Sequence, residues 1–479
     1  MDSRRSASAA AVSPAPDKSN ASAPGVTRDG MTREELRATF SLSSLFALRM
    51  LGLFFILPVF AVHARHLPGG ESQTLVGFAL GAYGLTQGLL QIPFGMASDR
   101  YGRKRVIVTG LLIFALGSFV AAMGTNIGIV ILGRVLQGAG AISAAVVAFT
   151  ADLTREQHRT KAMAVIGGSI GLVFALSLVT APWFYARIGM GGIFALTGLL
   201  SLAGIWVTLK VVPPEPAVQD TSRKVDVASL RDVLRNTELL RLNVGIFSLH
   251  AVQMAMFVVV PVALVQSGLE LGDHWKVYLP VVLVSFALMM PPILAAERRG
   301  RMKVMFLSSV ALMAAVQLGF LFCGEGIWPI AILLVFFFVA FNVLEASLPS
   351  LITRVAPAGA RGTAIGVYNT TQALGLFVGG LAGGMLSQYV NPSAVFVFGA
   401  ALVALWGVVA AGMRAPGDVQ TRRFPLVARD DPFTLREELV RIKGIREAVL
   451  LPEQGIARLT FQPDRWDEQA AMDLIGGKR

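Results

Sequence analysis

The feature that most constrains this chain is a series of long apolar runs, which recur roughly every 25–35 residues. A helix needs about 20 predominantly apolar residues to cross the roughly 30 Å of hydrocarbon in a bilayer. Because no water reaches backbone polar groups there, each span must satisfy its own hydrogen bonds as a helix. Only 15% of the 479 residues are charged, against about 25% in soluble domains. The sequence therefore predicts an all-α, multi-pass protein of the inner membrane.

The apolar runs predict twelve spans, in two sets of six. They lie at residues 40–62, 74–97, 105–124, 127–151, 162–186, 190–211, 240–266, 276–296, 303–323, 327–352, 362–388 and 393–413. The predicted organisation is therefore a disordered tail, a six-helix half, a linker, a second six-helix half and a small C-terminal domain, at residues 1–38, 39–211, 212–239, 240–414 and 424–479. In the linker, the stretch "SLRDVLRN" predicts a short amphipathic helix.

Lysine and arginine gather in the loops on one side of the predicted membrane. Two to four of them stand in each of the loops between spans two and three, four and five, eight and nine, and ten and eleven. The loops of the other side contain Arg65, Arg187 and Lys276. Basic short loops face the cytoplasm, so both termini are predicted to be cytoplasmic. The net charge of +12 is then a topology signal, and no nucleic-acid partner is expected.

A short charged turn, "GMASDRYGRKR" from Gly95 to Arg105, separates spans two and three. Its core "SDRYGRKRV" (98–106) aligns with "AERRGRMKV" (296–304) at the same place in the second half, which is typical of transporters built from parallel repeats. Gly102 permits a tight turn, and the Asp99 carboxylate can cap the N-terminus of another helix. Arg103 can pair with Asp152 at the end of span four. The alternative for the basic residues is simple anchoring at the membrane surface.

Four ionisable residues lie inside predicted spans: Arg49, Arg134, His250 and Glu345. An ionisable group at membrane depth is a functional hypothesis by default. A buried carboxyl such as Glu345 can load and release a proton, and His250 is the second candidate carrier. The structural alternatives are a permanent salt bridge for Glu345 and a satisfied core histidine for His250.

Uncharged polar residues inside the spans are candidates for lining a substrate cavity. These are Gln87, Gln91, Gln137, Gln253, Asn342 and Tyr368. Gln87 and Gln91 are four apart and share one helix face, as Asn342 and Glu345 do at a spacing of three. Hydrogen bonds between helices are the alternative role for all of them.

The C-terminal segment predicts the order strand, helix, strand, strand, helix, which favours a small ferredoxin-like domain. The stretch "KGIREAVLLPEQGIARLTFQP" resembles heavy-metal-associated domains. Such domains bind metal through Cys-x-x-Cys before the first helix, whereas Ala428 and Asp431 stand near those positions here. No metal is therefore expected at this domain.

Several motifs together resemble the major facilitator superfamily, and within it the drug:proton antiporters. "GMASDRYGRKR" is similar to the superfamily motif between spans two and three, and "GRVLQGAGA" (133–141) to the fourth-span antiporter motif. The resemblance implies a conformational switch formed by Gly95, Asp99, Arg100, Gly102 and Arg103 with Asp152. It also implies coupling roles for Arg134 and Gln137 in the fourth span. The proton-coupling roles predicted for Glu345, His250 and Arg49 rest instead on their position inside the spans. The fifth-span antiporter signature is only partly present, because Ser177 and Ala181 replace two of its glycines.

These observations predict a bacterial secondary transporter that moves small amphipathic molecules across the inner membrane by alternating access. Proton-coupled efflux is the leading hypothesis, with protons, substrate and lipid as partners and the proton gradient in place of a cofactor. Proton symport for nutrient uptake is one alternative, and a membrane sensor signalling through its C-terminal domain is another. The sequence contains no phosphate-binding GxxxxGK[ST] loop and no pattern that indicates an enzyme.

Overall fold

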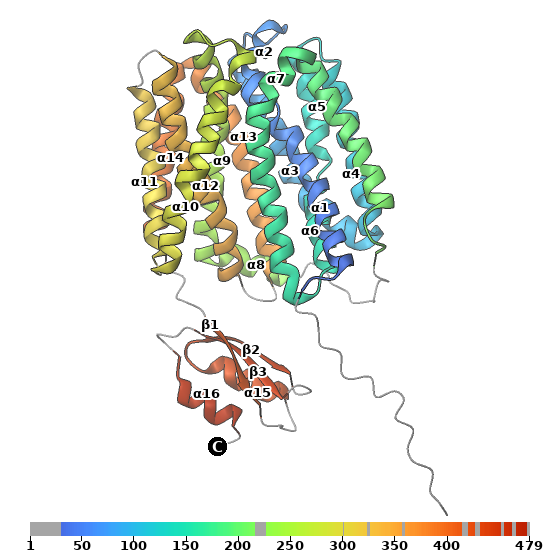
Figure 1. Ribbon diagram of the computed structural model, residues 1–479, viewed down its shortest axis with the longest axis vertical. Coiled ribbons are helices and arrows are strands. Elements are labelled where there is room, and N and C mark those ends of the chain that lie inside the picture. The colour runs from blue at the N-terminus through green and yellow to red at the C-terminus, as the bar shows by residue number, and fades with distance from the viewer. Residues whose placement is uncertain are drawn as a thin grey trace, which may run out of the picture.

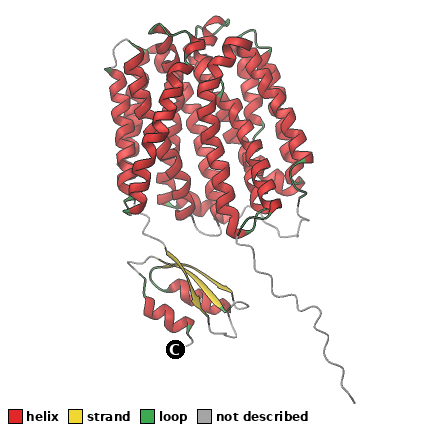
Figure 2. Ribbon diagram, in the orientation of Figure 1, coloured by secondary structure: helices red, strands yellow, loops and turns green. Residues whose placement is uncertain are grey.

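The computed structural model describes residues 30–215, 227–299, 301–322, 326–356, 360–413, 420–426, 432–451, 455–461 and 466–476. Within these ranges the chain forms a bundle of long helices and a small unit of strands and helices near the C-terminus (Figure 1). All of the strands in these described ranges lie in that small unit (Figure 2).

The first half of the bundle contains seven α-helices and one short 3-10 helix in the described residues. They are α1 (Arg33–Phe54), α2 (Leu57–His63), η1 (Ala64–His66), α3 (Gln73–Tyr101), α4 (Arg103–Ala122), α5 (Ile127–Ala139), α6 (Ser143–Asp152) and α7 (Glu156–Lys210). The first predicted span is interrupted before Pro58, which stands in the first turn of α2. The fourth predicted span is interrupted between α5 and α6.

The second half follows the linker, in which α8 (Val227–Arg235) confirms the predicted short helix. The remaining elements are α9 (Thr237–Gln266), η2 (Leu271–Asp273), α10 (Trp275–Arg298), α11 (Met302–Leu321), α12 (Ile327–Val355), α13 (Arg361–Tyr389) and α14 (Pro392–Ala411).

In the described residues, ten helical segments are long and apolar enough to cross a membrane. Residues 161–210 form one of them, although Gly189 interrupts α7 with a φ of +66°, a backbone conformation that glycine adopts readily. Predicted spans five and six are therefore the two helical stretches that meet at Gly189. Predicted span eleven corresponds to α13, a helix outside the ten. Twelve membrane crossings remain a prediction.

The first helix starts earlier than predicted. The Thr32 side chain accepts a hydrogen bond from the Glu35 backbone N–H, and the Glu35 carboxylate accepts one from the Thr32 N–H. This capping box begins α1 at Arg33. The prediction that residues 1–38 form a disordered tail was wrong for residues 33–38. It overlooked the capping box, which is formed by the four residues Thr32–Glu35 just before the apolar run. Residues 1–29 lie outside the described part of the chain.

The C-terminal unit has the predicted element order: β1 (Gln420–Pro425), α15 (Pro432–Arg441), β2 (Ile445–Leu451), β3 (Ile456–Phe461) and α16 (Glu468–Ile475). Strand β3 is central and pairs antiparallel with both neighbours, so that Leu459 lies opposite Arg422 on one side and Ala448 on the other. Side chains from both helices and the sheet form its own core, including Leu435, Leu439, Phe461 and Ile475. The ferredoxin-like assignment stays a prediction, and Ala428 and Asp431 lie outside the described residues.

The two halves of the bundle meet most extensively along α3 and α13. The Ser72 hydroxyl and the Thr74 backbone N–H both donate to Gln388 Oε1, each at 2.9 Å. The distance between α3 and α13 increases along α3. A Cβ added at Gly84 would lie 2.5 Å from the Ala373 carbonyl oxygen, whereas a Cβ added at Gly88 would have no atom closer than 3.5 Å. The halves are therefore tightest at the end of the bundle that carries Ser72 and Gln388. We call this the Gln388 end, and the end that carries the Asp99–Arg105 turn the basic end.

Candidate functional site

The charged turn between α3 and α4 is held by a small network centred on Arg103. Arg103 Nη1 lies 2.5 Å from Asp99 Oδ1 and also donates to Ser98 Oγ at 2.6 Å. Arg103 Nε donates to Asp152 Oδ2, at the end of α6, at 3.0 Å. Gly102 has a φ of +97°, so the turn requires a residue without a side chain there. The turn is thus tied to another helix of the same half.

A carboxylate from the linker, missed by the sequence analysis, caps α4. Glu215 accepts hydrogen bonds from the backbone N–H groups of Arg103, at 3.1 Å, and Lys104, at 2.6 Å. Asp99 was expected to cap a helix, but it pairs with Arg103 instead. Glu215 follows a Pro-Pro pair more than 100 residues further along the chain, and no local pattern points to its partners.

The other predicted switch residues lie beside this network. A Cβ added at Gly95 would lie 3.3 Å from Ala144 Cβ of α6, so the glycine permits close packing between these helices. Arg100 is exposed, and its guanidinium lies 5.4 Å from the centre of the Tyr101 ring. Arg100 therefore lies at the rim of the turn and not in its hydrogen-bonded centre.

A second ion pair ties α1 to the loop before α7. Arg155 Nε and Nη2 donate to Glu35 Oε1 and Oε2 at 2.8 and 2.9 Å, a two-pronged contact. Hydrogen bonding to the Glu35 carboxylate raises the pKa of Arg155. Sequence analysis missed this pair, because Glu35 was assigned to the tail.

The second copy of the turn, at residues 296–304, is arranged differently. Glu297 and Arg298 are exposed, and among the described residues no ion pair includes Glu297. Gly300 lies outside those residues. The two copies are therefore alike in sequence but not in their contacts.

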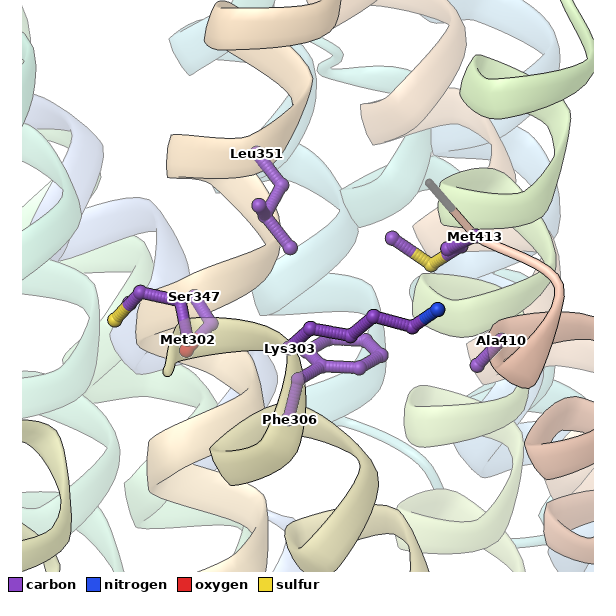
Figure 3. A pocket seen from close by; sticks show the side chains of 7 residues that line it. All are labelled: Met302, Lys303, Phe306, Ser347, Leu351, Ala410 and Met413. Atoms are coloured by element: carbon purple, nitrogen blue, oxygen red, sulfur yellow. The ribbon is translucent and has the colours of Figure 1, made fainter. Parts of the chain in front are cut away.

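A pocket lies beside this second turn (Figure 3). Its lining comes from α11, α12 and the end of α14: Met302, Lys303, Phe306, Ser347, Leu351, Ala410 and Met413. The Lys303 side chain extends past the Phe306 ring, and its Nζ donates to the Ala411 carbonyl oxygen at 3.0 Å. The pocket contains none of the predicted proton or substrate residues.

Two arginines are buried in the first half, around one tyrosine. Arg49 and Arg134 are 1% and 0% exposed, and their guanidinium carbons lie 5.4 and 4.9 Å from the centre of the Tyr83 ring. Arg134 donates to the Gly52 carbonyl oxygen at 3.2 Å and to Gln137 Oε1 at 2.7 Å. Arg49 donates to Ser143 Oγ.

Gln137 is fixed by this cluster. It accepts from Arg134, and its amide donates to Ser118 Oγ at 2.7 Å. Both polar atoms of its buried amide are engaged within the cluster, so in this structure it positions Arg134. That differs from the predicted substrate contact, because the arginine three residues away takes up its oxygen.

The second half brings Glu345 and His250 together. His250 Nε2 lies 3.8 Å from Glu345 Oε2 and 2.8 Å from the Gln372 amide nitrogen. His250 Nδ1 lies 3.2 Å from the Ile246 carbonyl oxygen. If Nδ1 donates its hydrogen to Ile246, the lone pair of Nε2 accepts from the Gln372 amide. A second proton on Nε2 must then displace the Gln372 hydrogen bond before it can face Glu345. This pair therefore joins α9 and α12 through titratable groups at membrane depth.

Comparison with known proteins assigns the chain to a family. Residues 39–296 and 281–452 match the model of the Major Facilitator Superfamily. The chain belongs to the major facilitator superfamily. It is 42% identical to the inner membrane transport protein YajR of Escherichia coli K12, over 89% of this chain and 94% of that protein. It is 25% identical to Multidrug resistance protein 2 of Bacillus subtilis 168, over 76% and 94%.

Solved structures agree at the level of the fold. A bacterial homologue of the human lysosomal transporter Spinster, in an inward-facing and occupied conformation, aligns with a TM-score of 0.62. The alignment covers 80% of this chain and 96% of that one, at 13% identity. The family match and the similarity to YajR identify the chain as a membrane-spanning transporter of the major facilitator superfamily and not an enzyme.

The other polar residues that were predicted to line a substrate cavity are buried or half-buried within the bundle. Gln87, Gln91, Gln253 and Tyr368 are buried, and Asn342 is half-buried. Each of the four buried side chains has a polar atom that, in the described part of the chain, finds no hydrogen-bond partner: Gln87 Oε1, both polar atoms of Gln91, Gln253 Oε1 and the Tyr368 hydroxyl. Buried polar groups normally have partners, so these atoms are candidates for contacts with a substrate or water. In the same described residues, no cluster of three or more His, Cys, Asp or Glu side chains could hold a metal ion.

Proposed function

We propose that this transporter exports small amphipathic molecules in exchange for protons. The observation that carries the proposal is the Glu345–His250 pair, whose titratable atoms lie 3.8 Å apart on two helices of the second half. A proton taken up by this pair changes its charge inside the membrane, where an unpaired charge is costly. Loading and unloading can therefore shift the balance between two conformations.

An aromatic cluster across the two halves suits the apolar part of such a substrate. The Phe174 ring of α7 lies 4.9 Å from Phe54 of α1 in the same half, measured between ring centres. It also lies 5.7 and 5.8 Å from Phe338 and Phe341 of α12 in the other half. Relatives named multidrug resistance proteins support a small-molecule cargo.

The structure corresponds, in this proposal, to an inward-facing state with the basic end toward the cytoplasm of a bacterial cell. The tight α3–α13 contacts at the Gln388 end support this assignment. Both termini are then cytoplasmic, twelve helical stretches cross the inner membrane, and the proton gradient supplies the energy. In this proposal the Arg103 network is the switch region: it ties three helices of the first half together at the basic end, so that this half moves as one body.

Proton movement in liposomes tests the function. Full-length protein is reconstituted with a pH-sensitive dye inside, an inward proton gradient is imposed, and amphipathic compounds of both charge signs are added. We expect compound-triggered proton movement in the wild type, and its loss in Glu345→Gln. Glu297→Gln, an exposed carboxylate of the same half, is the matched control and retains the movement.

Three other results would count against the proposal. Proton movement that survives in Glu345→Gln but not in His250→Gln would place the proton on the histidine alone and would contradict the role of Glu345. Compound uptake together with protons would favour symport. The absence of any compound-dependent proton movement would contradict proton exchange.

A further inference from the structure

Among the described residues, neither buried arginine of the first half forms an ion pair. Nε and Nη2 of Arg49 and Nη2 of Arg134 are buried and, within the described residues, have no hydrogen-bond partner. The hydroxyl of Tyr83, the ring between them, is also buried and unpartnered there. The two guanidinium groups thus lie around one ring, and several of their N–H donors have no acceptor in the described residues.

In the described part of the chain, no carboxylate of the first half pairs with this cluster. Between Leu36 and Pro214 the sequence contains four acidic residues, all at or near helix ends: Glu71, Asp99, Asp152 and Glu156. Asp99 and Asp152 are engaged by Arg103. Glu345 belongs to the second half, where its carboxylate lies beside His250.

Arginine keeps its charge inside proteins, so these two residues cannot themselves carry the transported proton. A buried charge without a partner is strongly unfavourable, and it is retained where it serves binding or coupling. The planar guanidinium suits the paired oxygens of a carboxylate, sulfonate or phosphate.

We propose that Arg49, Arg134 and the Tyr83 hydroxyl bind an acidic group of the transported molecule. The inference rests on the proposed function and narrows its substrate class to amphipathic anions. Phe54 stands five residues after Arg49 on α1 and touches Phe174. The apolar part of the molecule is placed against this aromatic cluster while its acidic group meets the arginines.

Binding of a matched pair of probes tests the proposal without any transport. The melting temperature of purified full-length protein is measured with 2-naphthalenesulfonate and with 2-naphthylmethylammonium, which share a ring system but differ in charge. We expect the sulfonate to raise the melting temperature by several degrees and the ammonium to leave it unchanged.

Variants of Arg49 separate binding from folding. In Arg49→Met we expect the effect of the sulfonate to disappear while the melting temperature without probe stays equal or rises, because an unpaired buried charge has been removed. Arg49→Lys, which keeps the charge, restores part of the effect. Arg187→Met, which removes an exposed arginine at the Gln388 end, keeps the sulfonate effect.

The proposal is overturned if the ammonium stabilises as much as the sulfonate, if neither does, or if Arg49→Met responds like the wild type. A marked fall in the melting temperature of Arg49→Met alone would also overturn it, since that assigns the arginine to structure. These outcomes are independent of proton exchange: sulfonate binding without proton movement sustains the anion site and refutes only the proposed coupling.

Discussion

Arg103 Nε lies 3.0 Å from Asp152 Oδ2, and this contact joins the start of α4 to the end of α6. The same guanidinium holds Asp99 of α3, so one side chain connects three helices of the first half at the basic end. The corresponding turn of the second half, with Glu297 exposed, has no such ion pair in the described residues. The contact can therefore hold one half in a single arrangement while the other moves against it.

The Arg103–Asp152 pair can be tested by a double-mutant cycle. We expect Arg103→Gln and Asp152→Asn each to lower the melting temperature, and the double variant to add little, with a coupling free energy of about 1 kcal/mol for this partly exposed pair. Arg105→Gln, an exposed arginine of the same turn, is the control and changes little. Additive effects of the two changes would show that the pair is not energetically coupled.

Removal of the Glu215 carboxylate should weaken the start of α4. Glu215→Ala leaves two backbone N–H groups without an acceptor, and we expect a loss of about 1–2 kcal/mol, in the range of other helix caps. Glu215→Gln keeps an acceptor oxygen and loses less. Thermal unfolding of the three proteins measures this, and an unchanged midpoint in Glu215→Ala would contradict the capping role.

Bulk at the α3–α13 contact should impair transport. A Cβ at Gly81 would come within 2.8 Å of the Phe377 carbonyl oxygen. Gly81→Val therefore keeps the halves apart at the Gln388 end, and we expect compound-driven proton flux to fall at least tenfold, equivalent to about 1.4 kcal/mol of overpacking. Gly88→Ala, with nothing nearer than 3.5 Å, should stay within about twofold. Equal proton flux in Gly81→Val and Gly88→Ala would show that transport does not require close packing between α3 and α13.

A substitution in the core of the C-terminal unit tests whether transport depends on the folding of that unit. Leu459 is fully buried in the small core, and Leu459→Ala should cost about 2–5 kcal/mol of that unit's stability. We expect protease cleavage beyond residue 420 to increase while proton flux remains above about half of the wild-type rate. A complete loss of flux would instead support a sensor that acts through this unit.

The apolar runs predicted the helices. The contact between Arg103 and Asp152 was predicted from the place of Asp152 at the end of a span and from the resemblance to the superfamily. Both predictions use span ends and a short motif, which can be read without coordinates. The Glu215 cap and the Glu35–Arg155 pair join residues 112 and 120 positions apart. Tyr83 was missed for a different reason, because a single aromatic residue in an apolar run resembles ordinary core packing. The roles of all these residues in transport remain predictions.

In the proposed mechanism, the two halves rock against each other when the proton site is loaded. Distances between spin labels test it most directly, in protein whose single cysteine, Cys323, is replaced. One pair of labels, at the exposed residues Arg105 and Val304, reports on the basic end. A second pair, at the exposed residues Met123 and Phe322, reports on the Gln388 end. We expect acidification, in the presence of a transported compound, to change the two distances in opposite directions in the wild type but not in Glu345→Gln. Distances that stay constant, or that change in the same direction at both ends, would contradict it.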